Sequence, residues 1–151
     1  MLARLRRFSS LPRPAKTIFL RAAALLPLIS ISLRLRGFRS TQNFLQSFVT
    51  NSLNAADNAS CETCVKLTAR MVLAATRNSP VPSTCLERSL ALWWLLARQG
   101  IATQIRIGVR KDGEKFAAHA WVERDGVAIG EPETPHLHYA AFVEEIPGVN
   151  S

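Results

Sequence analysis

An apolar helix with a well-marked start is the feature that most constrains the fold. Residues 90–97 read LALWWLLA and contain no polar position. A helix that is apolar all round must be covered on several sides. Thr84 and Glu87 form the Thr-x-x-Glu pattern of a capping box, and Gly100 supplies a stop in the left-handed conformation. The sequence therefore predicts a central helix from Cys85 to Gln99.

Downstream of this helix the pattern changes from helical to alternating. Residues 103–109 alternate between the two faces of a strand. Asp-Gly turn signals follow at 112–113 and 125–126. Two further strands are predicted at Phe116–Glu123 and Val127–Glu131. Helices that precede an antiparallel meander predict an α+β fold, in which the central helix packs on a small antiparallel sheet.

The first part of the chain is read as helical. Helices are predicted at Ala15–Leu35, with a kink at Pro27, at Thr41–Leu53 and at Cys61–Thr76, with a polar linker over 51–60. We expect a basic helical region over residues 1–58 and a core over residues 59–151, together forming one compact unit.

The charge of the chain is lopsided. The formal net charge is +8, and residues 1–39 carry nine basic and no acidic side chains. Such a region is either a solvated positive face or a docking surface for nucleic acid, anionic lipid or an acidic protein partner, such as an acidic peptide or a recognition protein. The apolar run Ala22–Leu33 is shorter than the roughly 20 residues that span a bilayer and lacks a cleavage site. We expect a buried or surface-lying helix, with membrane contact the less favoured use of it and no nucleic acid as partner.

Cysteine usage points to a free thiol. The chain has three cysteines, and an odd number is a poor disulfide framework, which fits a reducing, cytoplasmic location. Cys85 falls in the first turn of the predicted central helix, where partial positive charge and free amides stabilise a thiolate. The sequence predicts a nucleophile there. The alternative is a small side chain that fills space at a helix start.

His119 is the candidate base and Glu131 the candidate acid. His119 lies in the middle of a strand, where an imidazole needs a partner; the alternative is a core histidine bonded to a backbone carbonyl. A three-residue loop over 124–126 would pair it directly with Glu131. A two-residue loop would pair it with Pro132 and put Glu131 on the opposite face. We favour the three-residue loop, because it gives both side chains a partner, and keep Glu133 as the fallback acid.

Metal and cofactor chemistry is not expected. Cys61 and Cys64 have metal-ligand spacing, but no second pair of ligands stands at a suitable distance, and His136 and His138 lie in a proline-bounded tail. No phosphate-binding loop is present in the sequence.

The stretch from Cys85 to Glu131 resembles the transglutaminase-like core of lasso-peptide B proteins, the leader peptidases of lasso-peptide biosynthesis. The resemblance is carried by the Cys at a helix start, the Leu-rich helix that ends in Gly-Ile, the strand IGVR, and HAWVE followed by an Asp-Gly turn. It implies a papain-like triad of Cys85, His119 and Glu131. Asp is more usual at the third position, so Glu needs a different rotamer to reach the imidazole.

The resemblance also implies a reaction and partners. The reaction would be hydrolysis of one peptide bond, which separates the leader of a precursor peptide from its core. The segment before Cys61 shows no strand pattern, so we expect a separate leader-recognition protein rather than a fused one, and a downstream lasso cyclase. Two alternatives remain open at this point: a transamidase with the same residues, and a non-catalytic module that holds the precursor.

Overall fold

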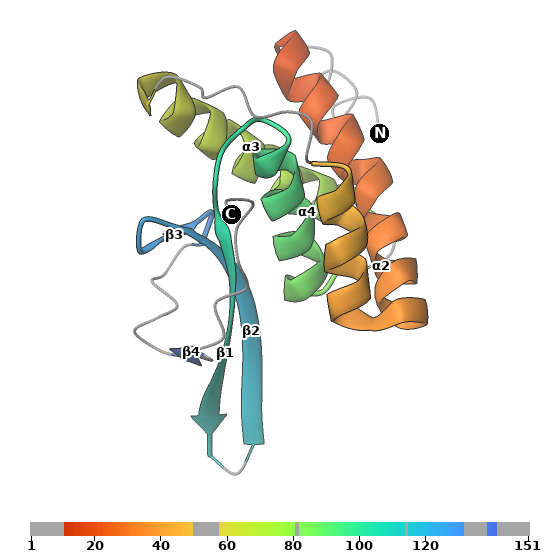
Figure 1. The fold of residues 1–151 in the computed structure, drawn as a ribbon, viewed down its shortest axis with the longest axis vertical. Helices are drawn as coiled ribbons and strands as arrows, with labels where there is room; N and C mark the ends of the chain where they lie inside the picture. Colours follow the sequence, from red (N-terminus) through yellow and green to blue (C-terminus); the bar gives the residue numbers. More distant parts are fainter. Residues whose placement is uncertain (1–10, 50–57, 81, 114, 132–138, 142–151) are drawn as a thin grey trace.

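The computed structural model describes residues 11–49, 58–80, 82–113, 115–131 and 139–141 of the chain, without the side chains of 58–61, 112 and 141. Three helices pack beside one sheet, from which the long β1–β2 hairpin extends away from the helices (Figure 1). The elements are α2 (Arg13–Ser47), α3 (Asn58–Asn78), α4 (Cys85–Ala97), β1 (Gln104–Asp112), β2 (Lys115–Arg124), β3 (Val127–Ile129) and β4 (Ala140–Ala141).

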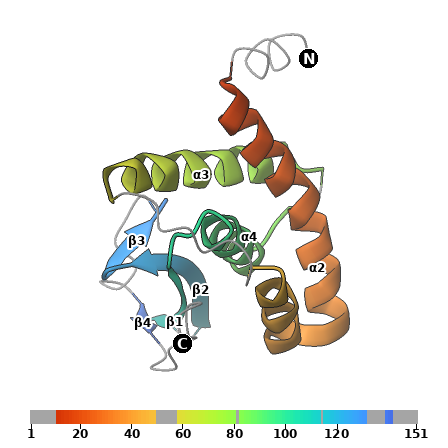
Figure 2. The same ribbon diagram turned by 45° about the horizontal axis from the view of Figure 1, so that its top comes forward.

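The sheet confirms the predicted α+β class. Its strand order is β3-β2-β1-β4, and all neighbouring strands are antiparallel. α4 lies between the sheet on one side and α2 and α3 on the other, and is seen almost end-on in Figure 2. The helix that carries Cys85 is therefore the centre of the molecule, as its sequence predicts.

The boundaries of α4 follow from local chemistry. The amide of Glu87 donates to Thr84 Oγ1 at 3.2 Å, and the amide of Thr84 donates to Glu87 Oε2 at 2.8 Å, which completes the predicted capping box. The helix ends at Ala97, two residues before the predicted end. Gly100 takes φ +75°, so the left-handed stop is confirmed.

Apolar burial on all sides of α4 forms the core. Leu90, Trp93 and Leu96 are almost fully buried. They belong to one cluster with side chains of the other helices and of the sheet, among them Leu26, Ile29, Val72, Ile105 and Val122. Fully burying one such side chain contributes about 1.5–3 kcal/mol, so this cluster fixes where the start of α4 stands relative to β2.

The two predicted N-terminal helices are present as the two legs of one element, α2, whose bounds differ from the predicted ones. α2 runs from Arg13 to Ser47, broken only by non-helical angles at Gly37 (φ 75°, ψ 179°). Thr41 Oγ1 donates to the Gly37 carbonyl at 2.8 Å and lies 2.9 Å from Ser32 Oγ, which ties the two legs together. Pro27 does not end the helix. It has no N–H to donate to the carbonyl of Ala23, one turn earlier, but both residues are exposed to water.

The predicted linker over 51–60 was partly wrong. Residues 50–57 lie outside the described residues, but α3 already begins at Asn58. Its end at Asn78 is two residues later than predicted, just before Pro80.

The turn between β2 and β3 corrects the predicted register. Asp125 (φ 51°) and Gly126 (φ 78°) both take left-handed angles, as a two-residue type I′ turn requires. Arg124 therefore faces Val127, and Val122 faces Ile129. The predicted three-residue loop was wrong, because Asp125 as well as Gly126 tolerates the left-handed conformation.

Candidate active site

Cys85 is the first residue of α4 and carries a free, half-buried thiol. The amide of Glu87 is used by the Thr84 hydroxyl, and the amide of Arg88 by the Thr84 carbonyl at 3.1 Å. The amides of Cys85 and Leu86 precede the first helical hydrogen bond. They are therefore the donors available to a negative charge that develops beside the sulfur.

Two side chains of the following turn attach this end of α4 to the sheet and to the candidate acid. Ser89, one turn after Cys85 on the same helical face, donates from Oγ to the Ala120 carbonyl at 2.9 Å. Arg88 donates from Nη2 to Glu131 Oε1 at 2.7 Å. Ala120 is the neighbour of His119 in β2, so the start of α4 is held close to the strand that carries the imidazole.

Glu131 uses its two oxygens for two different partners. Oε1 accepts from Arg88, while Oε2 lies 3.3 Å from His119 Nε2. The carboxylate side chain is only 12% exposed. The expected contact between His119 and Glu131 is thus present, and the chain Arg88–Glu131–His119 joins α4 to β2.

The route to that contact is not the one that the sequence suggested. With a two-residue turn, Glu131 would stand on the opposite face of the sheet if β3 continued. Instead β3 ends at Ile129, and Gly130 takes φ +72°, which redirects the chain. A Cβ at Gly130 would lie 3.1 Å from the Ala69 Cβ, so both its angle and its surroundings favour glycine.

The His119 ring lies among aromatic side chains. The Trp121 ring is nearly parallel to it at 6.1 Å, and the Tyr139 ring is tilted at 5.3 Å. Trp121 is fully buried. Trp121 shares the strand face of His119, two residues on, whereas no local signal in the sequence pointed to Tyr139.

Gly108 is the signal that could have revealed Tyr139. It faces His119 across the β1–β2 pair. A Cβ there would lie 2.9 Å from Tyr139 Cβ and 3.1 Å from the Ala140 carbonyl oxygen. A glycine inside a strand often marks such a close approach.

The nitrogen that Glu131 leaves free defines what His119 can do. A carboxylate only accepts hydrogen bonds, so its contact favours a proton on Nε2 and leaves a lone pair on Nδ1. Within the described part of the chain, Nδ1 makes no hydrogen bond, and none joins the Cys85 sulfur to the ring. The imidazole and the acid are brought together, whereas the thiol stands at the start of the helix whose Arg88 and Ser89 bond to Glu131 and to β2.

The other candidate residues contribute little to the site. Glu133, His136 and His138 lie outside the described residues, as does the side chain of Cys61. Among the described residues, no group of three or more His, Cys, Asp or Glu side chains could hold a metal ion.

A groove between α3 and β3 has the size for a peptide segment. It encloses about 900 Å³ between α3 and β3, and Gly130, the neighbour of Glu131, forms part of its wall. Apolar residues such as Val65, Ala69 and Leu73 line it, with charged side chains at its rim. Two of these, Lys66 and Glu62, form an ion pair at 2.6 Å, and the hydrogen bond and charge of Lys66 lower the pKa of the Glu62 carboxyl.

A comparison of the sequence with protein families agrees with this geometry. The profile described as transglutaminase-like superfamily matches residues 25–144 of the chain. The chain belongs to the transglutaminase-like superfamily. The match includes α4 and the sheet, and hence Cys85, His119 and Glu131. No curated protein and no solved structure is significantly similar to the chain.

Gly108→Ala tests whether the aromatic cluster depends on the missing Cβ. The added methyl would press on Tyr139 and on the backbone of β4, and overpacking of this kind costs about 1–3 kcal/mol. Urea unfolding followed by tryptophan fluorescence should show a lower midpoint. Ala118→Val, which adds bulk at an exposed position of β2, is the control and should change the midpoint little. Equal midpoints for Gly108→Ala and the unmodified protein would refute the close approach.

Proposed function

We propose that this protein is a cytoplasmic cysteine peptidase that removes the leader from a lasso-peptide precursor. One observation supports the peptidase chemistry most directly. Glu131 joins the imidazole of His119 to Arg88, three residues after Cys85, so that base, acid and the start of α4 are connected by hydrogen bonds. Membership of the transglutaminase-like superfamily agrees with such chemistry.

Cys85 and His119 carry out the steps of the proposed reaction. His119 Nδ1 takes the thiol proton, and the Cys85 sulfur attacks the carbonyl carbon at the leader–core junction. The oxyanion that forms is stabilised by the amides of Cys85 and Leu86. His119 then protonates the leaving amine, which becomes the N-terminus of the core peptide. Water, deprotonated by His119, hydrolyses the thioester and releases the leader as a carboxylic acid.

Glu131 acts on the imidazole rather than on the substrate. Its carboxylate holds the ring in one tautomer and stabilises the imidazolium that forms after proton transfer. Arg88 holds the other oxygen, so the acid cannot rotate away from the ring without losing an ion pair that is mostly buried. Arg88 is thus a positioning residue.

The assignment of the substrate rests on the sequence resemblance from Cys85 to Glu131. It implies a precursor peptide as substrate, a separate leader-recognition protein as partner and a lasso cyclase as the next enzyme. The groove of about 900 Å³ between α3 and β3 includes Gly130, the chain neighbour of Glu131, in its lining, and it is the surface that we assign to the precursor peptide. No metal or cofactor takes part in the proposed reaction.

The nucleophile is tested with Cys85→Ala. Precursor peptide and recognition protein are incubated with each variant, and the products are identified by mass spectrometry. We expect Cys85→Ala to abolish cleavage while unfolding as the unmodified protein does, because the side chain is only half-buried. Cys64→Ala, at another half-buried free thiol, is the matched control and should cleave normally.

The same products separate the alternative functions. A free core amine and a leader carboxylate indicate hydrolysis, whereas a new amide bond to an amine would assign the protein as a transamidase. Binding of precursor without any cleavage would indicate the non-catalytic module. Cleavage by Cys85→Ala at the normal rate is incompatible with the mechanism.

We expect the loss of the base to lower kcat/KM more than the loss of the acid does. General acid–base catalysis contributes about 10²- to 10⁴-fold, so His119→Ala should lower kcat/KM by a factor in that range. Glu131→Gln keeps the shape of the side chain and should cost less than either His119→Ala or Cys85→Ala. Glu123→Gln, a half-buried acid on the same strand as His119, is the control. If Glu131→Gln were as active as Glu123→Gln, the acid would be assigned wrongly.

A further inference from the structure

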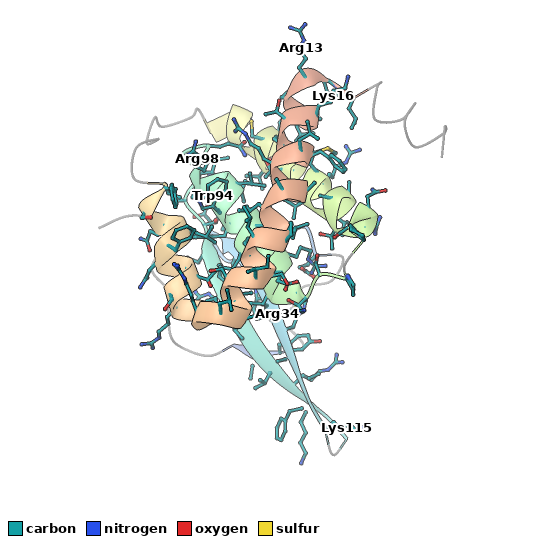
Figure 3. The ribbon with its side chains drawn as sticks, turned by 90° about the vertical axis from the view of Figure 1, so that its right-hand side faces the viewer. Arg13, Lys16, Arg34, Trp94, Arg98 and Lys115 are labelled. Atoms are coloured by element: carbon teal, nitrogen blue, oxygen red, sulfur yellow. The ribbon has the colours of Figure 1, made fainter. Side chains whose placement is uncertain are left out.

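The outward face of α2 is apolar and uncovered. Four large side chains that stand eight, three and four positions apart form one stripe along the helix. They are Leu20, Leu28, Ile31 and Leu35, with 57%, 63%, 55% and 78% of their surface exposed. In Figure 3 this helix lies in front of the rest of the molecule, and no other element crosses it. Single exposed leucines are normal, but a continuous stripe marks an interaction surface.

The opposite face of α2 is already occupied. Leu26 and Ile29 belong to the core cluster, together with side chains of α3 and α4. By length and composition α2 could cross a membrane. Because one face of α2 packs in the core, however, only the opposite face is available to contact another surface. The stripe from Leu20 to Leu35 is about 22 Å long at 1.5 Å per residue.

The charge around the stripe has a single sign. All acidic residues of the chain stand at Asp57 or later, so α2 has none. Arg13 and Arg21 flank the N-terminal end of the stripe and Arg34 and Arg36 its other end, all of them exposed; Figure 3 shows Arg13 and Arg34 at the two ends of this leg. Arg13, Arg21 and Arg34 form no ion pair with any described residue.

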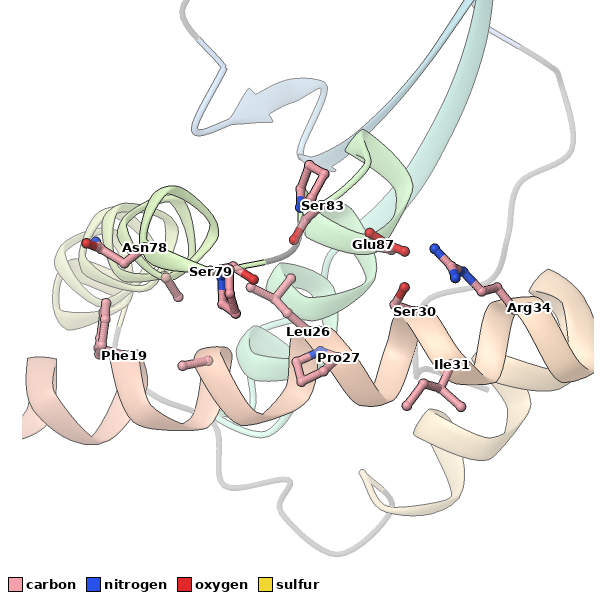
Figure 4. A pocket seen from close by; sticks show the side chains of 14 residues that line it. Phe19, Leu26, Pro27, Ser30, Ile31, Arg34, Asn78, Ser79, Ser83 and Glu87 are labelled. Atoms are coloured by element: carbon pink, nitrogen blue, oxygen red, sulfur yellow. The ribbon is translucent and has the colours of Figure 1, made fainter.

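A cleft continues the apolar surface inward. It encloses about 520 Å³ between α2, the end of α3 and the start of α4. Pro27 and Ile31 on α2 line it, and Arg34 stands at its edge (Figure 4). The uncovered surface is thus both a stripe and a recess, with a guanidinium beside it.

We propose that this face of α2 binds the surface of an anionic lipid bilayer, with the helix lying in the plane of the interface. An apolar face flanked by arginine and lacking acidic residues is the pattern of helices that lie in the headgroup region. The charged side chains that α2 places around the stripe are all cationic and match lipid phosphates. The one acid that lines the cleft among the described residues, Glu87 of α4, is used by the capping box at Thr84. Because α4 separates α2 from the sheet (Figure 2), the strand that carries His119 would lie away from the lipid. The proposal does not depend on the cleavage reaction.

Vesicle flotation with the full chain tests the proposal. Vesicles of equal parts phosphatidylcholine and phosphatidylglycerol should carry the protein upward, and vesicles of phosphatidylcholine alone should carry at least about tenfold less, since each basic residue near an anionic surface adds to the attraction. Salt should weaken the binding.

Paired variants distinguish binding through the stripe from nonspecific hydrophobic binding and from nonspecific electrostatic binding. Leu28→Glu with Leu35→Glu should reduce binding by more than about tenfold, since two apolar side chains no longer enter the interface. Phe116→Glu with Val127→Glu, at exposed apolar residues elsewhere, should not reduce it by as much as twofold. Arg21→Gln with Arg34→Gln should weaken binding, whereas Lys111→Gln with Lys115→Gln, at exposed lysines of the hairpin, should not. Circular dichroism checks that each variant is folded, and the arginine pair tests the face even if the glutamates disturb folding.

Several results would overturn the proposal. These are absence of binding to the anionic vesicles, or equal binding by the unmodified chain and the folded Leu28→Glu/Leu35→Glu variant. Another is a dimer in sedimentation equilibrium that this variant abolishes, with no vesicle binding, since the stripe would then be covered by a second copy. Binding of the leader-recognition protein through the stripe in the absence of lipid affinity would equally reject it.

Discussion

The carboxylate of Glu131 is shared between a guanidinium on the central helix and an imidazole on the sheet, and the geometry of the site depends on this sharing. With 12% of its side chain exposed, the carboxylate needs both partners to remain charged at low cost. Removing either partner would leave a mostly buried charge half-satisfied. The contact therefore does two things: it attaches the Cys85 end of α4 to β2, and it favours the tautomer of His119 that leaves a lone pair on Nδ1.

This contact is possible because the fold places two rigid elements first. Apolar burial on every side of α4 fixes the helix against the sheet, and the Ser89 hydroxyl fixes its rotation through the Ala120 carbonyl. The capping box determines which residue is first in the helix, and that residue is Cys85. The position of Cys85 relative to β2 thus follows from the packing of α4 and from its capping box.

The sequence predicted those parts of the structure that local signals determine. The start of α4, its left-handed stop and the presence of the strands β1, β2 and β3 depend on neighbouring residues, and they were confirmed. The path of the chain to Glu131 was predicted wrongly, although the contact with His119 was expected. Its route depends on Gly130, whose positive φ and closeness to Ala69 are tertiary features. Tyr139 was missed for the same reason, because it reaches Gly108 across the sheet from a distant segment. Hydropathy alone also could not show which face of α2 remains uncovered; that required the packing of α3 and α4.

The rate at which iodoacetamide alkylates Cys85 tests the central claim most directly. If His119 takes the proton of the thiol, Cys85 should be alkylated faster than Cys64, the other half-buried free thiol, when both sites are followed by peptide mapping. His119→Ala should then lower the rate at Cys85 and leave the rate at Cys64 unchanged. Equal rates at Cys85 in the unmodified protein and in folded His119→Ala would contradict the account.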